Sequence, residues 1–265
     1  MLLATVLGVG LMVAAACVLN NWIDRDIDRL MARTHKRVLA NGQISPQAAL
    51  AYAVVLGLGG GSLLLTADNR LSVIIVGCGF AVYAGLYSLY LKRRSASAPL
   101  VGSLAGAAPP LAGYCAVSDQ FDAGALILLS IFALWQMPHF YAIAIYRLED
   151  YAAAAIPVLP VKKGVPAAKR HIVGYILAFT AAALMLALDG YTGYCYLAVA
   201  FMLGLVWLAV AWAAYKARDD RRWVRGLFVC SLVTIFILNV AMAADPVIPP
   251  GPSRLPTGGI ASAAP

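Results

Sequence analysis

Long apolar segments alternate with short polar ones along nearly the whole chain. Each apolar segment runs for about twenty residues, the length that an α-helix needs to cross the hydrocarbon core of a bilayer. A membrane β-barrel would need strands of about ten residues with alternating polarity, and the sequence shows no such alternation. The pattern therefore predicts an all-α fold, a polytopic transmembrane helical bundle. We expect its eight spans at residues 1–23, 47–66, 71–91, 99–117, 122–146, 171–188, 191–215 and 226–244.

The placement of charge supports this arrangement and assigns the two faces of the membrane. Only 12% of the 265 residues are charged, about half the share of a typical soluble domain. Of the twenty Lys and Arg, eighteen fall in alternate connections, at 24–46, 92–98, 147–171 and 216–225. This is the positive-inside pattern, so we expect these connections in the cytoplasm and both chain ends outside. Because topology accounts for the net charge of +8, we expect no nucleic-acid partner.

The chain is organised as one membrane domain, residues 1–244, and a short tail. The tail, residues 245–265, is rich in Pro, Gly, Ser and Ala, a composition that predicts disorder. All five cysteines fall within the predicted spans and show no CxxC spacing. The sequence therefore indicates neither a disulfide framework nor a zinc site.

The first cytoplasmic connection begins with a stripe of oxygen-bearing side chains. Residues four apart on a helix drift by only about 40°, so Asn20, Asp24 and Asp28 share one face, while Asp26 points elsewhere. Oxygen ligands without sulfur or imidazole suit Mg²⁺, which takes one or two carboxylates and completes its shell with substrate phosphate oxygens. The stripe therefore predicts a site for Mg²⁺ and a phosphorylated ligand.

Basic residues surround the acidic stripe. Arginine guanidinium groups suit phosphate oxygens, and metal ligands next to phosphate ligands indicate a diphosphate site. An ordinary juxtamembrane charge cluster would also explain the basic residues, but it does not require an amide and two carboxylates on one stripe. The basic residues are Arg29, Arg33, Lys36 and Arg37 in the first connection and Lys92, Arg93 and Arg94 in the next basic one.

A second polar group lies at the end of the fifth predicted span. If that helix continues past the membrane, His139, Tyr146 and Asp150 fall within about 40° of one another, with Arg147 beside them. Polar groups at membrane depth are functional candidates, although a lone histidine can also be a helix-to-helix hydrogen bond. The last connection, "KARDDRRWVR", is interpreted as a solvated topology signal rather than part of a site.

These residues carry a resemblance to a known family. "NNWIDRDIDRLMARTHKR" resembles the N-xxx-D-xxx-D motif of the UbiA-type intramembrane prenyltransferases. "YSLYLKRRS", "GSLAGAAPPLAGYCAV" and "LWQMPHFYAIAIYRLEDYAAAAIPVLPVKKG" are similar to one branch, the protoheme IX farnesyltransferases (haem O synthases). The similarity runs from about Leu11 to the eighth span. Where the quinone-type branches carry a second aspartate-rich motif, this sequence keeps only Glu149 and Asp150.

The resemblance implies an activity and a set of partners. Farnesyl diphosphate would donate its farnesyl group to the C2 vinyl of haem b, and water would supply the hydroxyl of the resulting hydroxyethylfarnesyl chain. It implies a multi-pass protein of the cell inner membrane with its active site facing the cytoplasm. Haem A synthase or terminal oxidase assembly factors are possible partners. Members of the branch have nine spans and this sequence begins at what resembles their second, so we expect eight spans and a missing first one.

The resemblance also assigns roles to individual residues. It implies Mg²⁺ and diphosphate binding by Asn20, Asp24 and Asp28, and a haem role for His139. Two other functions stay open: a quinone-type aromatic prenyltransferase and, in a different class, an anionic solute transporter. A transporter would be expected to show internal repeats, and none is visible in the sequence. The remaining substrate-binding residues are expected to be Arg33, Arg37, Lys92, Arg93, Arg147 and Asp150.

Overall fold

The computed structural model describes residues 1–66, 70–215, 217 and 219–247. Within them the chain forms long helices, and the β-structure is limited to one isolated bridge between Thr192 and Pro246. Eight helical segments in this part of the chain are long and apolar enough to cross a membrane. The predicted all-α bundle with eight spans is confirmed.

The helices follow the predicted order with two short helices added between the spans. Those are α2 (Arg25–Asp28) and α7 (Leu148–Ala153). The third span is a composite, because the α-helix α4 continues directly as a π-helix, η1. The spans are α1 (Leu2–Ile23), α3 (Pro46–Thr66), α4 (Arg70–Ala81) with η1 (Val82–Leu91), α5 (Ala98–Ser118), α6 (Ala123–Tyr146), α8 (Leu159–Leu188), α9 (Tyr194–Trp212) followed by the 3₁₀ turn η2 (Ala213–Tyr215), and α10 (Asp220–Ala244).

Two helices begin earlier than their apolar segments predict. α8 begins at Leu159, with a proline in its first turn, and tolerates a break at Gly164, where φ is +79°. α10 begins at Asp220 because the Asp219 side chain accepts hydrogen bonds from the backbone N–H groups of Arg221 and Arg222. Charged residues thus extend both helices beyond their apolar lengths, and the basic residues that precede the eighth predicted span are helical.

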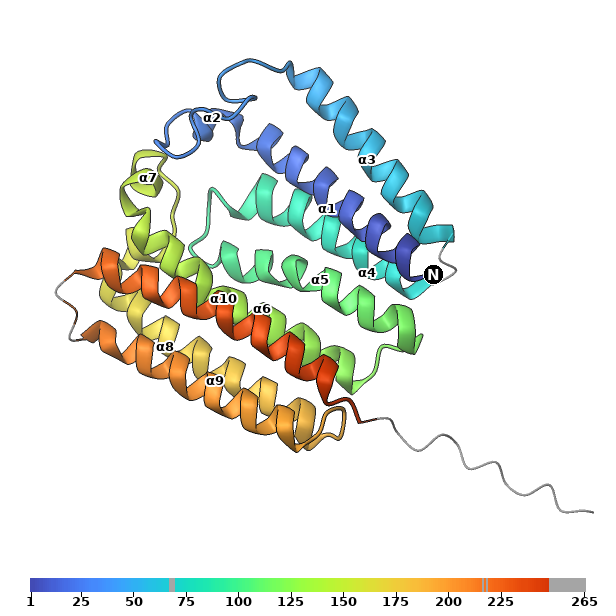
Figure 1. The fold of residues 1–265 in the computed structure, drawn as a ribbon. Helices are drawn as coiled ribbons and strands as arrows, with labels where there is room; N and C mark the ends of the chain where they lie inside the picture. The colour runs from blue at the N-terminus through green and yellow to red at the C-terminus, as the bar shows by residue number, and fades with distance from the viewer. Residues whose placement is uncertain (67–69, 216, 218, 248–265) are drawn as a thin grey trace, which may run out of the picture.

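The bundle consists of two groups of helices that meet at α5 and α6 (Figure 1). One group contains α1, α3, α4 and α5, and the other α6, α8, α9 and α10, with most of the buried hydrophobic core in the second group. In the first group α1 lies against α3 through small residues, since a Cβ on Gly60 would come within 2.8 Å of the Gly8 carbonyl oxygen. Small residues allow such close approach in membranes.

The two short helices α2 and α7 lie at one end of the bundle, and the N-terminus lies at the other (Figure 1). At the N-terminal end, Asp245 accepts a hydrogen bond from the backbone N–H of Tyr196 and its carbonyl accepts one from Gly193. The start of the predicted disordered tail, residues 245–247, is therefore attached to the bundle, and residues 248–265 of that prediction lie outside the described residues.

Candidate active site

The acidic stripe is present as predicted. The backbone hydrogen bonds of an α-helix continue across the junction of α1 and α2. Asp24 N–H donates to the Asn20 carbonyl at 2.9 Å, and Asp28 N–H donates to the Asp24 carbonyl at 2.8 Å. All three side chains are buried, with relative exposures of 9% for Asn20 and 2% for each aspartate. Buried carboxylates are costly unless they are paired, so the bundle must supply cations.

Cations from two other segments meet the stripe. The Lys92 ammonium, at the end of η1, donates to Asp24 Oδ2 and lies 3.4 Å from Asn20 Oδ1. Arg37, from the first connection, donates to Asp28 Oδ2 at 2.8 Å. Asn20 Oδ1 also accepts from Ser88 Oγ at 3.0 Å. The tertiary structure thus brings the predicted metal ligands and two predicted diphosphate ligands together.

The donor set fits a magnesium diphosphate. Asp24 Oδ1 is buried and has no hydrogen-bond partner in the described part of the chain, so it has an open position for a cation. The described residues contain no group of three His, Cys, Asp or Glu able to hold a metal by themselves. Mg²⁺ does not require one, since phosphate oxygens and water complete its shell. Burial raises the pKa of Asp24 above its ordinary value, and Lys92 opposes that rise.

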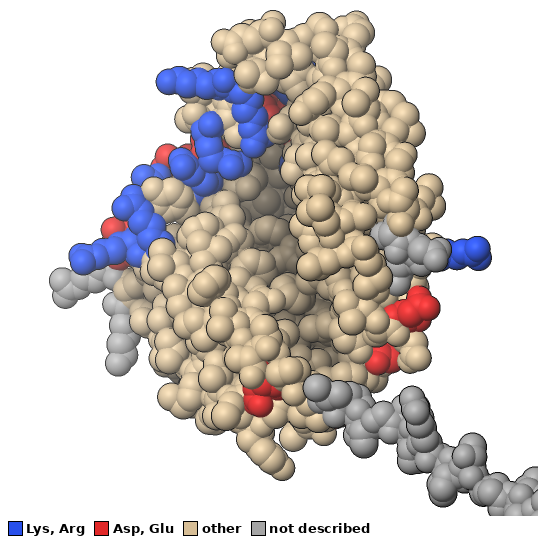
Figure 2. All heavy atoms as spheres, turned by 45° about the vertical axis from the view of Figure 1, so that its right-hand side comes forward, with Lys and Arg blue, Asp and Glu red and all other residues tan. Residues whose placement is uncertain are grey.

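Asn20 and Asp28 of the stripe line a cavity of about 310 Å³, which we call the polar pocket, while Asp24 is not among its lining residues and reaches it through Lys92, which bonds Asp24 and lines the pocket. Basic side chains gather at this end of the molecule, beside a deep hollow (Figure 2). Arg33 reaches the pocket and makes no hydrogen bond or ion pair with another described residue, so its charge is available to a ligand. The lining residues are Asn20, Asp28, Met31, Arg33, Arg37, Tyr83, Tyr87, Lys92, Ser95, Ala98, Pro99, Phe140, Tyr141, Ile143, Ala144, Tyr151, Ile156 and Val158.

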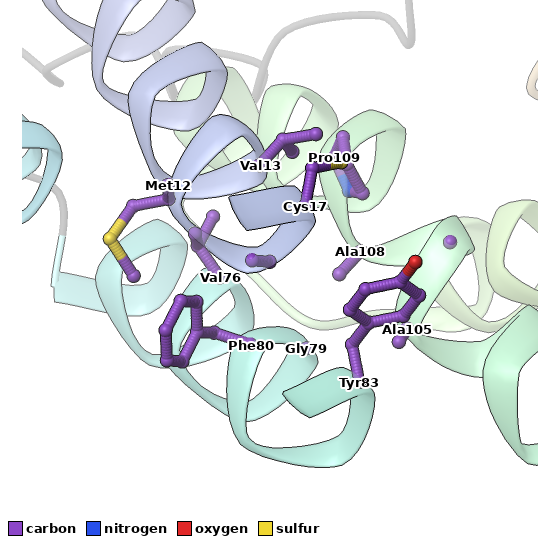
Figure 3. A pocket seen from close by; sticks show the side chains of 12 residues that line it. Met12, Val13, Cys17, Val76, Gly79, Phe80, Tyr83, Ala105, Ala108 and Pro109 are labelled. Carbon is purple, nitrogen blue, oxygen red and sulfur yellow. The ribbon is translucent and has the colours of Figure 1, made fainter. Parts of the chain in front are cut away.

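A second, apolar pocket of about 250 Å³ adjoins the polar one. Side chains of α1, α4, η1 and α5 converge on it (Figure 3). Tyr83 lines both pockets, and its ring stacks on that of Tyr87 with 5.6 Å between centroids. The arrangement suits a ligand with a charged head and an apolar tail. The apolar pocket is lined by Met12, Val13, Ala16, Cys17, Val76, Gly79, Phe80, Tyr83, Ala105, Gly106, Ala108 and Pro109.

Tyr83 and Tyr87 are not among the site residues expected from the sequence. Both lie on η1, where the backbone bonds run from residue i to residue i+5 rather than to i+4, as in the 2.8 Å bond from Lys92 N–H to the Tyr87 carbonyl. π-Helical turns are rare and frequent at functional sites. The altered register determines which side chains of this span face the stripe, and no α-helical periodicity would have shown it.

Arg93 is not brought to the polar pocket. Its guanidinium forms two hydrogen bonds with the Asp26 carboxylate, at 2.6 and 2.7 Å, and one with the Ile23 carbonyl. These contacts hold the pKa of Asp26 below its ordinary value, mainly through the bonds from Arg93. Asp26 does point away from the stripe, as predicted, and it holds Arg93 with it. The placement gives no support to a diphosphate role for Arg93.

His139 faces α10 rather than the acidic stripe. Its Nδ1 lies 2.8 Å from Ser231 Oγ, and its ring packs against Phe228 with 4.5 Å between centroids and the ring planes tilted by 31°. The Ser231 hydroxyl donates to the Phe228 carbonyl at 2.6 Å, so its oxygen accepts from His139. In the neutral imidazole the proton is therefore on Nδ1 and the lone pair on Nε2. The helix-to-helix hydrogen bond considered for this residue is present.

The grouping of His139, Tyr146 and Asp150 on one face depended on a fifth span that continues as one helix, and this condition is not met. α6 ends at Tyr146, because Arg147 leaves helical geometry with φ −108° and ψ +30°, and α7 begins at Leu148. Asp150 accepts a hydrogen bond from Ala32 N–H at 3.0 Å and lies 3.9 Å from the Arg147 guanidinium. It therefore joins the connection after α1 to the one after α6, and it is not among the residues lining the polar pocket.

Fold and site together define a polytopic membrane protein with a polar, charged pocket next to an apolar one. Comparison with known proteins is in agreement: the chain belongs to the UbiA prenyltransferase family, whose model matches residues 1–240. Within that family its curated relatives include protoheme IX farnesyltransferases of several bacteria.

The curated relatives cover nearly the whole chain. The protoheme IX farnesyltransferase of Photorhabdus laumondii is 57% identical over 93% of this chain and 84% of its own. The proteins of the same name from Sodalis glossinidius and Chromohalobacter salexigens are each 58% identical, over 93% and 92% of this chain and 84% and 82% of their own.

Solved structures support the fold. A digeranylgeranylglyceryl phosphate synthase superimposes with a TM-score of 0.74 at 17% identity, over 91% of this chain and 84% of its own. A UbiA homolog from Aeropyrum pernix K1 superimposes with a TM-score of 0.70 at 19% identity, over 91% of this chain and 88% of its own. These TM-scores show a shared fold, and sequence identities below 20% carry no information about the substrate.

Proposed function

We propose that the protein transfers the farnesyl group of farnesyl diphosphate to the C2 vinyl of haem b, giving haem O, at the cytoplasmic face of the cell inner membrane. The observation that carries the proposal is the buried stripe of Asn20, Asp24 and Asp28 with its cations beside the polar pocket, which shares Tyr83 with the apolar pocket. The relatives named protoheme IX farnesyltransferase support the choice of haem over an aromatic acid.

The diphosphate head would lie in the polar pocket. Asn20, Asp24 and Asp28 would hold Mg²⁺, and Lys92, Arg37 and Arg33 would bind diphosphate oxygens. Mg²⁺ bound there supplies stabilisation of the negative charge that develops on the departing diphosphate. The guanidinium and ammonium groups would stabilise the same negative charge in a site with little water. Hydrogen-bond donors in such sites typically contribute 10²–10³-fold each to the rate.

The farnesyl chain would lie in the apolar pocket below. When the C1–O bond breaks, its electron pair leaves with the diphosphate and C1 becomes an allylic cation. The rings of Tyr83 and Tyr87, at the junction of the two pockets, would stabilise this cation through their π faces, an effect of about 0.5–2 kcal/mol. The apolar lining keeps water from C1.

The acceptor completes the reaction. The π electrons of the vinyl group form the new carbon–carbon bond to C1, and the positive charge moves to the vinyl carbon next to the porphyrin. Water adds to that carbon and releases a proton, which leaves the hydroxyethylfarnesyl side chain. No oxidant or reductant is required.

The test is product analysis with the purified full chain in phosphatidylcholine nanodiscs. Farnesyl diphosphate, haem b and MgCl₂ should yield hydroxyethylfarnesyl haem by mass spectrometry, with ¹⁸O in its hydroxyl when the reaction is run in H₂¹⁸O. Chelation of Mg²⁺ should stop it. Farnesylation of 4-hydroxybenzoate but not of haem would contradict the proposal and favour a quinone-type enzyme.

A further inference from the structure

A third cavity, of about 490 Å³, lies between α6 and α10 at the same membrane face. Three arginines from three different segments meet there, Arg33 from the first cytoplasmic connection, Arg147 from the end of α6 and Arg225 from α10. We call it the arginine pocket. Its lining residues are Arg33, Ala142, Ile143, Tyr146, Arg147, Val224, Arg225, Phe228 and Val229.

Tyr146 holds two of the arginines close together. The guanidinium carbons of Arg147 and Arg225 each lie 5.0 Å from the centre of its ring, so they are at most twice that distance apart. Arg225 also donates to the Tyr146 hydroxyl at 2.9 Å. Within the described residues, Asp150, 3.9 Å from Arg147, is the one carboxylate paired with any of the three arginines. Like charges held together favour an anionic ligand between them.

Membrane topology alone does not explain this arrangement. The positive-inside rule requires basic residues in the connection, but it does not require three of them to meet above an apolar cavity. The floor of the pocket is apolar, and Phe228 continues it downward to His139 and Trp135, which stack with 5.3 Å between ring centroids. The ligand that fits has anionic groups at one end and a flat apolar body.

We propose that the arginine pocket binds the acceptor tetrapyrrole, with its two propionate carboxylates on Arg225, Arg147 and Arg33. This inference rests on the proposed function, in which haem b is the acceptor. Arginine forks suit carboxylates, and the apolar floor with Phe228 receives the ring. His139, with its Nε2 lone pair free of hydrogen bonds to other described residues, lies on the same α6–α10 face.

The position of the pocket suits transfer between the two substrates. Arg33 and Ile143 line both the arginine pocket and the polar pocket, so the two cavities meet at these residues. A ring bound from the α10 side would therefore lie next to the diphosphate end of the farnesyl chain. The prenyl donor and the tetrapyrrole would occupy separate pockets rather than one common cavity.

Spectral titration with haem b tests the site. The full chain in nanodiscs of phosphatidylcholine, which carry no net charge, is compared with Arg225→Gln and with Arg222→Gln, which removes the same charge on an exposed residue of α10 outside the pocket. We expect Arg225→Gln to weaken haem b binding about tenfold or more and Arg222→Gln to leave it unchanged. Haem b dimethyl ester, which lacks the carboxylates, should bind wild type and Arg225→Gln equally weakly.

Binding of the donor separates this inference from the proposed function. Farnesyl thiodiphosphate with Mg²⁺ should bind Arg225→Gln as tightly as wild type and should bind Arg33→Gln less tightly, because Arg33 lines both pockets. If wild type binds the donor and neither binds nor farnesylates haem b, the proposed function fails. If wild type binds and farnesylates haem b and Arg225→Gln does so equally well, the arginine pocket is not the acceptor site.

The same guanidinium groups could bind lipid phosphate. Thermal stability is therefore measured in phosphatidylcholine nanodiscs with and without phosphatidylglycerol. We expect the gain from anionic lipid to be equal in wild type and Arg225→Gln. A gain lost in Arg225→Gln, together with unchanged haem b affinity, would make the pocket a lipid headgroup site and overturn the proposal.

Discussion

The Lys92 ammonium donates to the Asp24 carboxylate and also reaches Asn20 Oδ1 at 3.4 Å. It therefore lies between two of the side chains expected to hold Mg²⁺, as a positive charge supplied by the chain itself. Asp24 is 2% exposed, and a carboxylate this buried is expensive without a cation. Lys92 stabilises the stripe when no other cation is present.

Removing this lysine should make folding stability depend on the metal. We expect Lys92→Met to lower the free energy of unfolding by about 3–5 kcal/mol, the usual cost of a buried charge that loses its partner. Millimolar MgCl₂ should restore part of that loss by binding the same oxygens, and should stabilise wild type less. Thermal melting in nanodiscs measures both effects. With Lys92→Arg as control, equal Mg²⁺ responses in all three proteins would contradict the expectation.

The two neighbouring aspartates provide a matched test of the stripe. Asp24→Asn should reduce product formation by at least about 10²-fold, because the amide lacks the negative charge of the carboxylate and binds Mg²⁺ more weakly, so less charge on the diphosphate is stabilised. Asp26→Asn makes the same change two residues away, on a side chain that is 60% exposed and bonded to Arg93, and should keep most of the activity. Product is measured by mass spectrometry, and fluorescence-detected size exclusion checks that both variants fold. A comparable loss in both variants would refute the role of the stripe.

The Asp26–Arg93 pair should contribute a small pH-dependent stability. Arg93 holds the pKa of Asp26 below its ordinary value of 3.8, so the pair stabilises the fold fully above that value. The contribution is lost as the pH falls through the lowered pKa, where the folded protein takes up the proton. Because both side chains are well exposed, we expect less than about 1 kcal/mol. Melting curves from pH 3 to 7 should show a slightly smaller acid loss for Asp26→Asn than for wild type; an identical loss would show that the pair has no effect.

His139 and Ser231 should act as one unit toward haem. Ser231 accepts a hydrogen bond from Nδ1 of His139 and so keeps the proton on that nitrogen. When a metal-binding histidine loses the hydrogen-bond partner of its other ring nitrogen, metal affinity typically falls 10–100-fold. We expect Ser231→Ala to weaken haem b binding by about that factor and His139→Ala to weaken it more, with farnesyl thiodiphosphate binding unchanged in both. The double variant should bind haem b as His139→Ala does; additive losses would show that the two residues act independently.

Close packing of α5 against α6 should be sensitive to a single methyl group. A Cβ on Gly106 would overlap the Gln136 side chain, which donates to the Ser103 carbonyl at 3.0 Å. We expect Gly106→Ala to lower stability by about 1–3 kcal/mol and, because Gly106 lines the apolar pocket, to weaken donor binding. Gly113→Ala, on the same helix with open space around it, should change neither. Unfolding curves and donor titrations measure the two effects, and equal behaviour of the variants would refute the packing argument.

The sequence by itself determined the properties that depend on neighbours along the chain. Eight apolar segments of bilayer length could be counted without knowing how they pack. The basic residues in alternate connections distinguished the two ends of the helical bundle. The stripe of Asn20, Asp24 and Asp28 followed from helical geometry alone. Such features arise within one helix, where spacing along the chain sets direction in space.

Only the tertiary structure decided which side chains from different helices meet. Nothing in the spacing showed that Lys92 pairs with Asp24 while the adjacent Arg93 turns to Asp26, or that the π-helix η1 places Tyr83 between two pockets. The end of α6 at Arg147 separated Asp150 from the polar pocket, and the early start of α10 brought Arg225 into the arginine pocket. Contacts between helices depend on the rotation and depth of each helix in the bundle, which packing sets and local spacing does not record.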